Sequence, residues 1–368
     1  MPRLLADENM SGLGPLFAGL GELRTKPGRA IGPADLAGVD ALLIRSVTRV
    51  DAGLIAESPL SFVGSATIGV DHVDQPALAA RGIAFASAPG CNADAVGDYV
   101  LSAIAAWCQQ QGRDDWRQLK VGVIGRGHVG GSLQRRLSAL GVEVRACDPP
   151  LAARGVAGLV DLEAVLASDV ISLHVPLTRS GQWPSAGLIG ADELATLAQG
   201  QLLINTSRGG VVDESALKQR LDQPRPPAVV IDTWENEPLP DSELVNRVWL
   251  ATPHIAGYSR EGRLRGSWMI ATALAKHLGR PVPVDLEQVL PPRLRRKAKP
   301  KNLVECILAG YDVRHDDAAF RRLAGDAAEA SGAGFDRLRR DYPMRAEFSR
   351  IRFADLPAGA QAAGFSLA

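Results

Sequence analysis

The chain has 368 residues, and 41 lysines and arginines balance 41 acidic side chains, so its formal net charge is zero. This length predicts about two to three domains, which can bury sizeable cores without disulfides or metals. The balanced charge argues against a nucleic-acid binder, which normally carries a strong basic excess. No apolar run reaches the roughly 18 residues that indicate a membrane span.

Two further observations concern the compartment. Acidic residues at positions 7 and 8 come too early for the apolar core of a signal peptide. The four cysteines show no metal-ligand spacing and suggest no disulfide framework. We therefore expect a cytoplasmic protein with no metal site and with neither nucleic acid nor membrane as a partner.

The first part of the chain alternates short apolar runs with helical stretches. Residues 41–46, 61–66 and 83–88 are predicted to be buried strands. The spacing between them suits helical crossovers, and therefore a parallel sheet. Residues 98–110 then predict a long, largely buried helix.

A second series of strands begins near residue 119. Six apolar runs, with helices predicted between most of them, indicate a doubly wound α/β sheet. They cover residues 119–125, 142–148, 169–176, 200–207, 228–234 and 248–254.

The remainder reads as a separate region. After a helix predicted at residues 266–279, the basic, proline-flanked residues 291–301 indicate a linker, and the tail beyond it is helix-rich in pattern. The six cations from Arg293 to Lys301 also leave open a nucleic-acid patch, although a solvated linker is the more ordinary interpretation.

A glycine motif points to a dinucleotide. Gly125, Gly127 and Gly130 fit G-x-G-x-x-G between a predicted strand and a predicted helix, and Asp148 ends the next strand. Glycines there permit a tight turn and close backbone approach to a pyrophosphate at the helix N-terminus. The acid would accept hydrogen bonds from ribose hydroxyls and repel a 2′-phosphate, and two prolines rather than an arginine come directly after it. The motif therefore predicts NAD rather than NADP.

Three polar residues follow successive strands of the second series. Arg208, Glu237 and His254 come where α/β sheets place their ligands. Oxidation of a secondary alcohol needs a base, and an imidazole titrates near neutrality. A carboxylate would orient that imidazole, and an arginine would bind a substrate carboxylate through two hydrogen bonds. Each residue alone is commonplace, but their joint placement favours an active site.

The glycine loop followed by Arg, Glu and His resembles the pattern of the D-isomer-specific 2-hydroxyacid dehydrogenases. Local matches such as GSATIGVDHVD, DTWENEP, TPHIAGYS and DYPMRAEF extend the resemblance from residue 6 to about residue 348. It implies NAD-dependent oxidation of a small phosphorylated hydroxy acid, with proton transfer through His254. It further implies substrate contacts at Ser46, Thr67 and Tyr258, and NAD contacts at Asp148, Val175, Asp232 and Gly257.

The resemblance also implies the architecture. We expect two doubly wound parallel-sheet α/β domains, with a Rossmann NAD domain (residues 94–256) inserted in a flavodoxin-like substrate domain (residues 1–93 and 257–286). The active site would lie in the cleft between them and close by hinge motion. Residues 287–368 would form a small α+β dimerisation domain, which makes the protein a homodimer.

Some alternatives stay open. Arg45, Ser46, Thr48 and Arg49 cluster after a strand, where they could bind an oxyanion or cap a helix. A sister enzyme of the phosphoglycerate or hydroxypyruvate type is the nearest rival, although the tail lacks the βαββαβ pattern of a regulatory domain. A non-catalytic NAD-sensing module could retain the same motifs.

Overall fold

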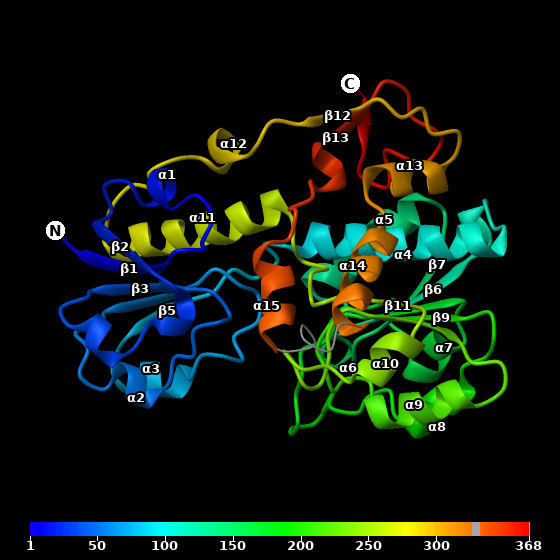
Figure 1. The fold of residues 1–368 in the computed structure, drawn as a ribbon, viewed down its shortest axis with the longest axis horizontal. Coiled ribbons are helices and arrows are strands. Elements are labelled where there is room, and N and C mark those ends of the chain that lie inside the picture. Colours follow the sequence, from blue (N-terminus) through cyan, green and yellow to red (C-terminus); the bar gives the residue numbers. More distant parts are fainter. Residues whose placement is uncertain (326–331, 368) are drawn as a thin grey trace. The chain divides into compact units, whose positions relative to one another are not determined.

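The computed structural model describes residues 1–325 and 332–367, and the chain divides into two compact units (Figure 1). The first consists of Met1–Asn92 and Ser259–Pro292, and the second of Ala93–Tyr258 and Arg293–Ala368. Both have parallel sheets with helices between the strands, as the sequence predicts. None of the described helices combines the length and the hydrophobicity that a membrane crossing needs.

The first unit contains a five-stranded parallel sheet in the order β2-β1-β3-β4-β5, the order of flavodoxin-like folds. The predicted strands correspond to β3 (Ala41–Ile44), β4 (Phe62–Ser65) and β5 (Ala84–Ala86). The sequence missed β1 (Arg3–Asp7) and β2 (Glu22–Lys26), and β2 lies at the sheet edge with mostly exposed side chains. A polar edge strand lacks the apolar pattern on which strand prediction depends.

Helices cover the sheet of the first unit. They are α1 (Leu13–Phe17), α2 (Ala52–Ile55), α3 (Gln75–Ala80), α11 (Arg260–His277) and α12 (Leu286–Val289), with 3-10 turns at Gly28–Ala30 and Pro33–Leu36. Although α11 lies far along the chain, its Ile270 packs directly against Gly64 of β4. A side chain at Gly64 would occupy the volume of Ile270, so this glycine permits the close approach of helix and strand.

The second unit contains the six predicted strands in the order β11-β10-β9-β8-β6-β7. A single isolated bridge also pairs Ala146 of β7 with Leu159. All these strands are parallel, but β7 is added on one side of β6 and β8 on the other. The strand order therefore reverses between β6 and β8, which is the switch point where such sheets bind dinucleotides. The strands are β6 (Lys120–Ile124), β7 (Glu143–Cys147), β8 (Val170–Leu173), β9 (Leu202–Asn205), β10 (Ala228–Ile231) and β11 (Leu250–Ala251).

The helix α4 (Ala93–Gln111) forms the centre of this unit, and nearly all its residues from Ala93 to Cys108 are buried. Such all-round burial explains why its sequence is mostly apolar between Ala93 and Cys108. Around the sheet lie α5 (His128–Ala139), α6 (Pro149–Ala152), α7 (Leu162–Leu166), α8 (Ala191–Thr196), α9 (Glu214–Asp222) and α10 (Ser242–Arg247), with a 3-10 turn at Trp116–Gln118.

The tail packs on this NAD-type fold and shares its core. It contains α13 (Leu303–Gly310), α14 (Val313–Gly325), α15 (Gly332–Arg340), a 3-10 turn at Phe348–Arg350, and a parallel sheet of β12 (Leu294–Arg296), β13 (Ile351–Phe353) and β14 (Ser366–Leu367). The linker expected at residues 291–301 is thus wrong in part, because β12 pairs there with β13. The sequence did not predict this strand, because its side chains are mostly polar. The strand is instead stabilised by pairing with β13, more than 50 residues away.

Two side chains of α4 tie the tail down. Asp98 accepts hydrogen bonds from Arg136 (2.6 Å) and from the backbone N–H of Phe348 (2.8 Å). Burial raises the pKa of Asp98 to about 7. Ser102 donates to the carbonyl of Tyr311 and accepts from the N–H of Val313. The tail and the NAD-type fold therefore form one structural unit.

Candidate active site

The glycine loop lies between β6 and α5 and fits a dinucleotide. Gly125 has φ of 87°, and a side chain there would lie 2.6 Å from the carbonyl oxygen of His174. A side chain at Gly130 would collide with the carbonyl of Gly125, so glycine lets α5 pack closely on β6. Gly127 faces open space and caps α5 without a side-chain hydrogen bond. The first N–H groups of α5 are thus available to a pyrophosphate.

The acid predicted to hold the ribose stands beside this loop. Asp148 follows β7, and its carboxylate accepts the N–H groups of Arg126 (2.7 Å) and Leu151 (3.0 Å). These two bonds fix its orientation, while each carboxylate oxygen retains a lone pair for a ribose hydroxyl. The residues present therefore suit NAD, with Asp148 and the N-terminus of α5 as its holders.

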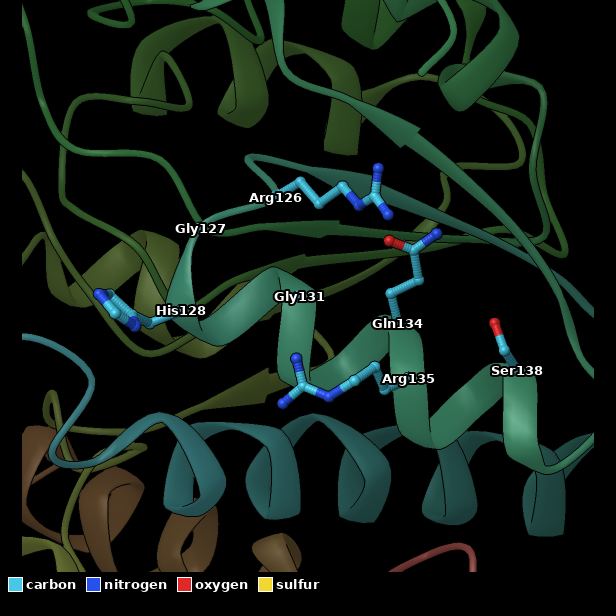
Figure 2. A pocket seen from close by; sticks show the side chains of 7 residues that line it. All are labelled: Arg126, Gly127, His128, Gly131, Gln134, Arg135 and Ser138. Carbon is cyan, nitrogen blue, oxygen red and sulfur yellow. The ribbon is translucent and has the colours of Figure 1, made fainter. Parts of the chain in front are cut away.

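A pocket of about 800 Å³ begins at the glycine loop and follows one side of α5. In Figure 2, Arg126 extends from the loop over α5, on the same side of the helix as Gln134. The guanidinium of Arg126 donates to the carbonyl of Ala157 at 3.2 Å. The residues after Asp148 gave no sign of this arginine, because Arg126 lies within the glycine motif itself and only the fold places it beside the pocket.

The clearest catalytic geometry is the contact between Glu237 and His254. The imidazole Nδ1 lies 2.7 Å from Oε2 and 3.0 Å from Oε1 of the carboxylate. Burial raises the pKa of Glu237, but the charge and hydrogen bond of His254, the N–H of Trp234 and the charge of Arg339 together hold it below its ordinary value. An ionised Glu237 accepts the Nδ1 proton, which leaves Nε2 as the proton acceptor.

The backbone around His254 is unusual and well supported. His254 has φ of 57°, a left-handed conformation that costs a non-glycine residue on the order of 1 kcal/mol. Asp232, fully buried at the end of β10, accepts the N–H groups of Ile255 (2.8 Å) and Ala256 (3.0 Å) and the hydroxyl of Thr252 (2.6 Å). Its carboxylate therefore fixes the loop that carries the imidazole.

Arg208 lies three residues after the end of β9. Asn205 donates to the carbonyl of Arg208 at 3.1 Å, and the guanidinium of Arg208 donates to the carbonyl of Ser207 at 2.8 Å. The next residue, Gly209, touches the backbone of Trp234, whose N–H binds Glu237. The chain following β9 is thus packed against the chain following β10, as parallel strands require.

The other predicted NAD contacts occupy the same unit. Val175 follows β8, and a side chain at Gly125 would lie 2.8 Å from its Cγ1, so Val175 borders the glycine loop. Gly257 is partly exposed in the loop after His254. His174 binds Ser172 through Nε2 at 2.9 Å, and burial lowers its pKa to about 3. His174 is therefore a neutral structural residue.

Two tail arginines that the sequence analysis did not single out lie beside this loop. Arg345 donates to the carbonyls of Ala95, Ile255, Ala256 and Tyr258, at 2.5 to 3.3 Å. Arg339 lies over the ring of Tyr258, 5.7 Å from its centre. The motif DYPMRAEF contains Arg345, but only the fold reveals its target.

The predicted substrate residues of the first unit have local partners. The hydroxyl groups of Thr67 and Ser65 share a hydrogen bond of 2.7 Å, and the hydroxyl of Thr67 donates to the carbonyl of Gly69 at 2.9 Å. Ser65 in turn lies 2.9 Å from His72 Nε2. Ser46 is exposed in the turn after β3. Arg208, Glu237 and His254 all belong to the second unit, so the first unit by itself shows Ser46 and Thr67 without these catalytic candidates.

The arginine cluster after β3 is largely engaged. Arg45 binds the buried carboxylate of Asp7 at 3.0 Å, and Thr48 donates to the carbonyl of Gly28 at 2.9 Å. Arg49 is exposed and pairs with Asp51 at 3.4 Å. These residues hold the first unit together, so the idea of a shared oxyanion site loses most of its donors.

Comparison with known proteins gives a consistent result. A sequence model described as the NAD binding domain of D-isomer specific 2-hydroxyacid dehydrogenases matches residues 102–256, and a domain of unknown function matches residues 287–362. Erythronate-4-phosphate dehydrogenase of Marinobacter nauticus is 46% identical over 95% of this chain and 94% of that protein. That of Pseudomonas aeruginosa is 47% identical over 96% and 95%.

Solved structures agree on the fold. D-lactate dehydrogenase from Aquifex aeolicus, solved with NAD and lactic acid, covers 78% of this chain and 97% of its own, with a TM-score of 0.60 and 22% identity. The predicted α/β class is confirmed by the fold, and the NAD cofactor by the match to the NAD binding domain of the family. The chain therefore belongs to the erythronate-4-phosphate dehydrogenases, NAD-dependent enzymes within the D-isomer specific 2-hydroxyacid dehydrogenase family.

Proposed function

We propose that this protein oxidises 4-phospho-D-erythronate with NAD to (R)-3-hydroxy-2-oxo-4-phosphooxybutanoate, a step in pyridoxine 5′-phosphate synthesis. The observation that carries the proposal is the Glu237–His254 contact at 2.7 Å, at the carboxyl ends of strands in an NAD-binding fold. The names of the relatives supply the substrate.

His254 acts as the proton-transfer residue. Its Nε2 takes the proton of the C2 hydroxyl as the C2 hydrogen leaves with its electron pair and the C–O bond becomes a carbonyl. Bound NAD supplies the hydride acceptor. Glu237 stabilises the imidazolium that forms, because its charge lies next to Nδ1.

Arg208 orients the substrate by binding its C1 carboxylate with two parallel N–H donors. It also polarises the developing carbonyl at C2. Ser46, Thr67 and Tyr258 are the further proposed substrate contacts, each through a hydroxyl group. The cofactor residues are Gly125, Gly127, Gly130, Asp148, Val175, Asp232 and Gly257.

The proposal extends to assembly and compartment. We propose a homodimer formed through residues 287–368, working in the cytoplasm. All four cysteines are buried and none forms a disulfide in the described part of the chain, which suits a reducing compartment. Sedimentation of the full-length chain, compared with a variant whose tail surface is altered, tests the dimer. A monomer at micromolar concentration would contradict it.

The test of the activity is an assay of NADH formation with 4-phospho-D-erythronate, 3-phosphoglycerate and glycerate in parallel. We expect 4-phospho-D-erythronate to give the highest kcat/KM. A preference for 3-phosphoglycerate would instead identify the sister activity. NADH binding without turnover of any of the three acids would indicate an NAD-sensing module.

The proton-transfer role has its own test. The His254→Ala variant should lose about 10²- to 10⁴-fold in kcat, the usual range for general acid–base catalysis, while NADH still binds. The matched control is His277→Ala. His277 is exposed in the first unit, where it hydrogen-bonds to Ser61. Full activity of the His254 variant would refute the assignment.

A further inference from the structure

Arg339, on α15 of the tail, is a cation beside the reaction centre that the proposed mechanism does not use. Its guanidinium lies 5.7 Å from the ring centre of Tyr258 and 5.7 Å from that of Phe335. Among the described residues it has no hydrogen bond or ion pair, and its Nε is buried without an acceptor. The group is therefore held by aromatic faces instead of by an anion.

The surroundings fix this guanidinium in place. Phe335 lies one turn before Arg339 on the same face of α15, and its ring is fully buried with its edge against Phe320 (5.8 Å between centres). Tyr258 packs edge-on against Tyr342 at 5.9 Å. Two anchored rings thus leave the side chain of Arg339 little freedom. Binding of an anion therefore costs little side-chain entropy, because Arg339 is already ordered.

Arg339 also acts electrostatically on the catalytic pair. Burial lowers the pKa of Arg339, but electrostatic interactions, among them those with Glu237, Asp336 and Asp232, outweigh it and raise this pKa above its ordinary value. Conversely, the charge of Arg339 is one of the factors that lower the pKa of Glu237. A permanent cation therefore lies close to the reacting atoms, in a partly buried place where charge interactions are strong.

The substrate proposed above is anionic at both ends, and its two anions need separate partners. Arg208 is assigned to the carboxylate. Of the cations in the turn after β3, Arg45 already binds Asp7 and Arg49 pairs with Asp51. Arg339 is the guanidinium beside Tyr258, and no carboxylate of the described residues accepts its N–H donors.

We propose that Arg339 binds the phosphate group of the substrate and makes the enzyme selective for phosphorylated hydroxy acids. The planar guanidinium presents two parallel N–H donors to two phosphate oxygens. The inference rests on the proposed function and adds to it a residue from the tail. It also gives α15 a direct role in recognition.

The first experiment compares 4-phospho-D-erythronate with D-erythronate. In Arg339→Gln, the ratio of kcat/KM for the phosphorylated acid to that for the unphosphorylated acid should fall about 10- to 100-fold, the range for a lost charge-assisted hydrogen bond. In Arg339→Lys, which keeps the charge but lacks the planar pair of N–H donors, this ratio should fall less. Arg340→Gln is the matched control, since Arg340 is exposed and pairs with Asp341.

The ratio separates recognition from a structural role. If Arg339 only supported Tyr258 or Glu237, both substrates would lose activity together and the ratio would stay within about threefold of the wild type. That result overturns the proposal. So does a ratio that falls equally in Arg340→Gln.

A second measurement needs no variant and no turnover. Phenylglyoxal modification of the wild-type protein with NADH bound, mapped by mass spectrometry, should be slower at Arg339 with inorganic phosphate than with chloride at equal ionic strength. Arg340 should react equally in both. Equal rates at Arg339 would overturn the inference even where Arg339→Gln fails to fold. If the wild type oxidised neither acid, the proposed function would fail, while phosphate protection would still decide the role of Arg339.

Discussion

The exchange of Glu237 for Gln tests the catalytic pair most directly, because it changes one charge with almost no change in shape. In the wild type, Oε1 accepts the N–H of Trp234 at 3.0 Å and both oxygens face Nδ1 of His254. In the variant, the amide oxygen keeps the Trp234 bond only if the NH₂ group takes the position 2.7 Å from Nδ1. Two donors would then face each other.

The imidazole resolves this conflict by moving its proton to Nε2, which can then no longer accept the substrate proton. The alternative amide orientation leaves the buried N–H of Trp234 unpaired, at about 1–3 kcal/mol. Loss of the carboxylate also removes a charge-assisted bond to the imidazolium, worth about 1.5–3 kcal/mol. Together these costs predict a fall in kcat of about 10²- to 10⁴-fold.

Steady-state kinetics with saturating NAD measure this fall, and NADH fluorescence titration should show an unchanged dissociation constant, because the glycine loop is untouched. Glu235→Gln is the matched control, since Glu235 is an exposed carboxylate in the same loop. A Glu237→Gln variant with kcat within about threefold of the wild type would refute the reasoning on the tautomer.

Three other predictions use different parts of the second unit. Asp148→Asn can keep the cap to the Leu151 N–H through its amide oxygen, but it removes the charge and the acceptor of the Arg126 N–H. The ratio of NADH to NADPH affinity should therefore fall about tenfold or more in fluorescence titrations; an unmoved ratio contradicts the ribose role. Gly130→Ala should lower the melting temperature and weaken NADH binding because its methyl group meets the Gly125 carbonyl, whereas Gly131→Ala, with its nearest atom at 3.6 Å, should not. Glu214→Gln tests a buried acid, because burial raises the pKa of Glu214 from 4.5 to about 7. Between about pH 5.5 and 8 the unfolded chain is already ionised at Glu214, whereas the folded protein loses its proton only at the cost of a buried charge. Urea unfolding should therefore show that the wild type loses up to about 2 kcal/mol relative to the variant over this range. A pH-independent difference would show that Glu214 ionises normally.

Local sequence was sufficient where the chemistry is contiguous. The glycine loop needs only its own residues, the preceding strand and the following helix, so Gly125, Gly127 and Gly130 were predictable. Glu237 and His254 were predictable because each directly follows an apolar run, and parallel strands bring their carboxyl ends together. The structure adds the contact itself, at 2.7 Å.

Long-range packing hid the rest. Arg45 looked available in the sequence, but it binds Asp7, 38 residues away, on β1. Arg339 looked like one of several cations on an amphipathic helix, and only the fold brings it to the ring of Tyr258. No local pattern encodes either pairing, since both depend on which faces meet after folding.

The four carbonyl groups bound by Arg345 have a consequence for protein engineering. A chain shortened before β12 would leave the oxygens of Ala95, Ile255, Ala256 and Tyr258 without this donor, at about 1 kcal/mol or more for each one that stays buried. Three of these carbonyls lie within four residues of His254. The tail therefore cannot be removed, or exchanged with that of a relative, independently of the rest of the chain. A functional chimera has to take the segment around residues 255–258 and the tail that binds it from the same protein.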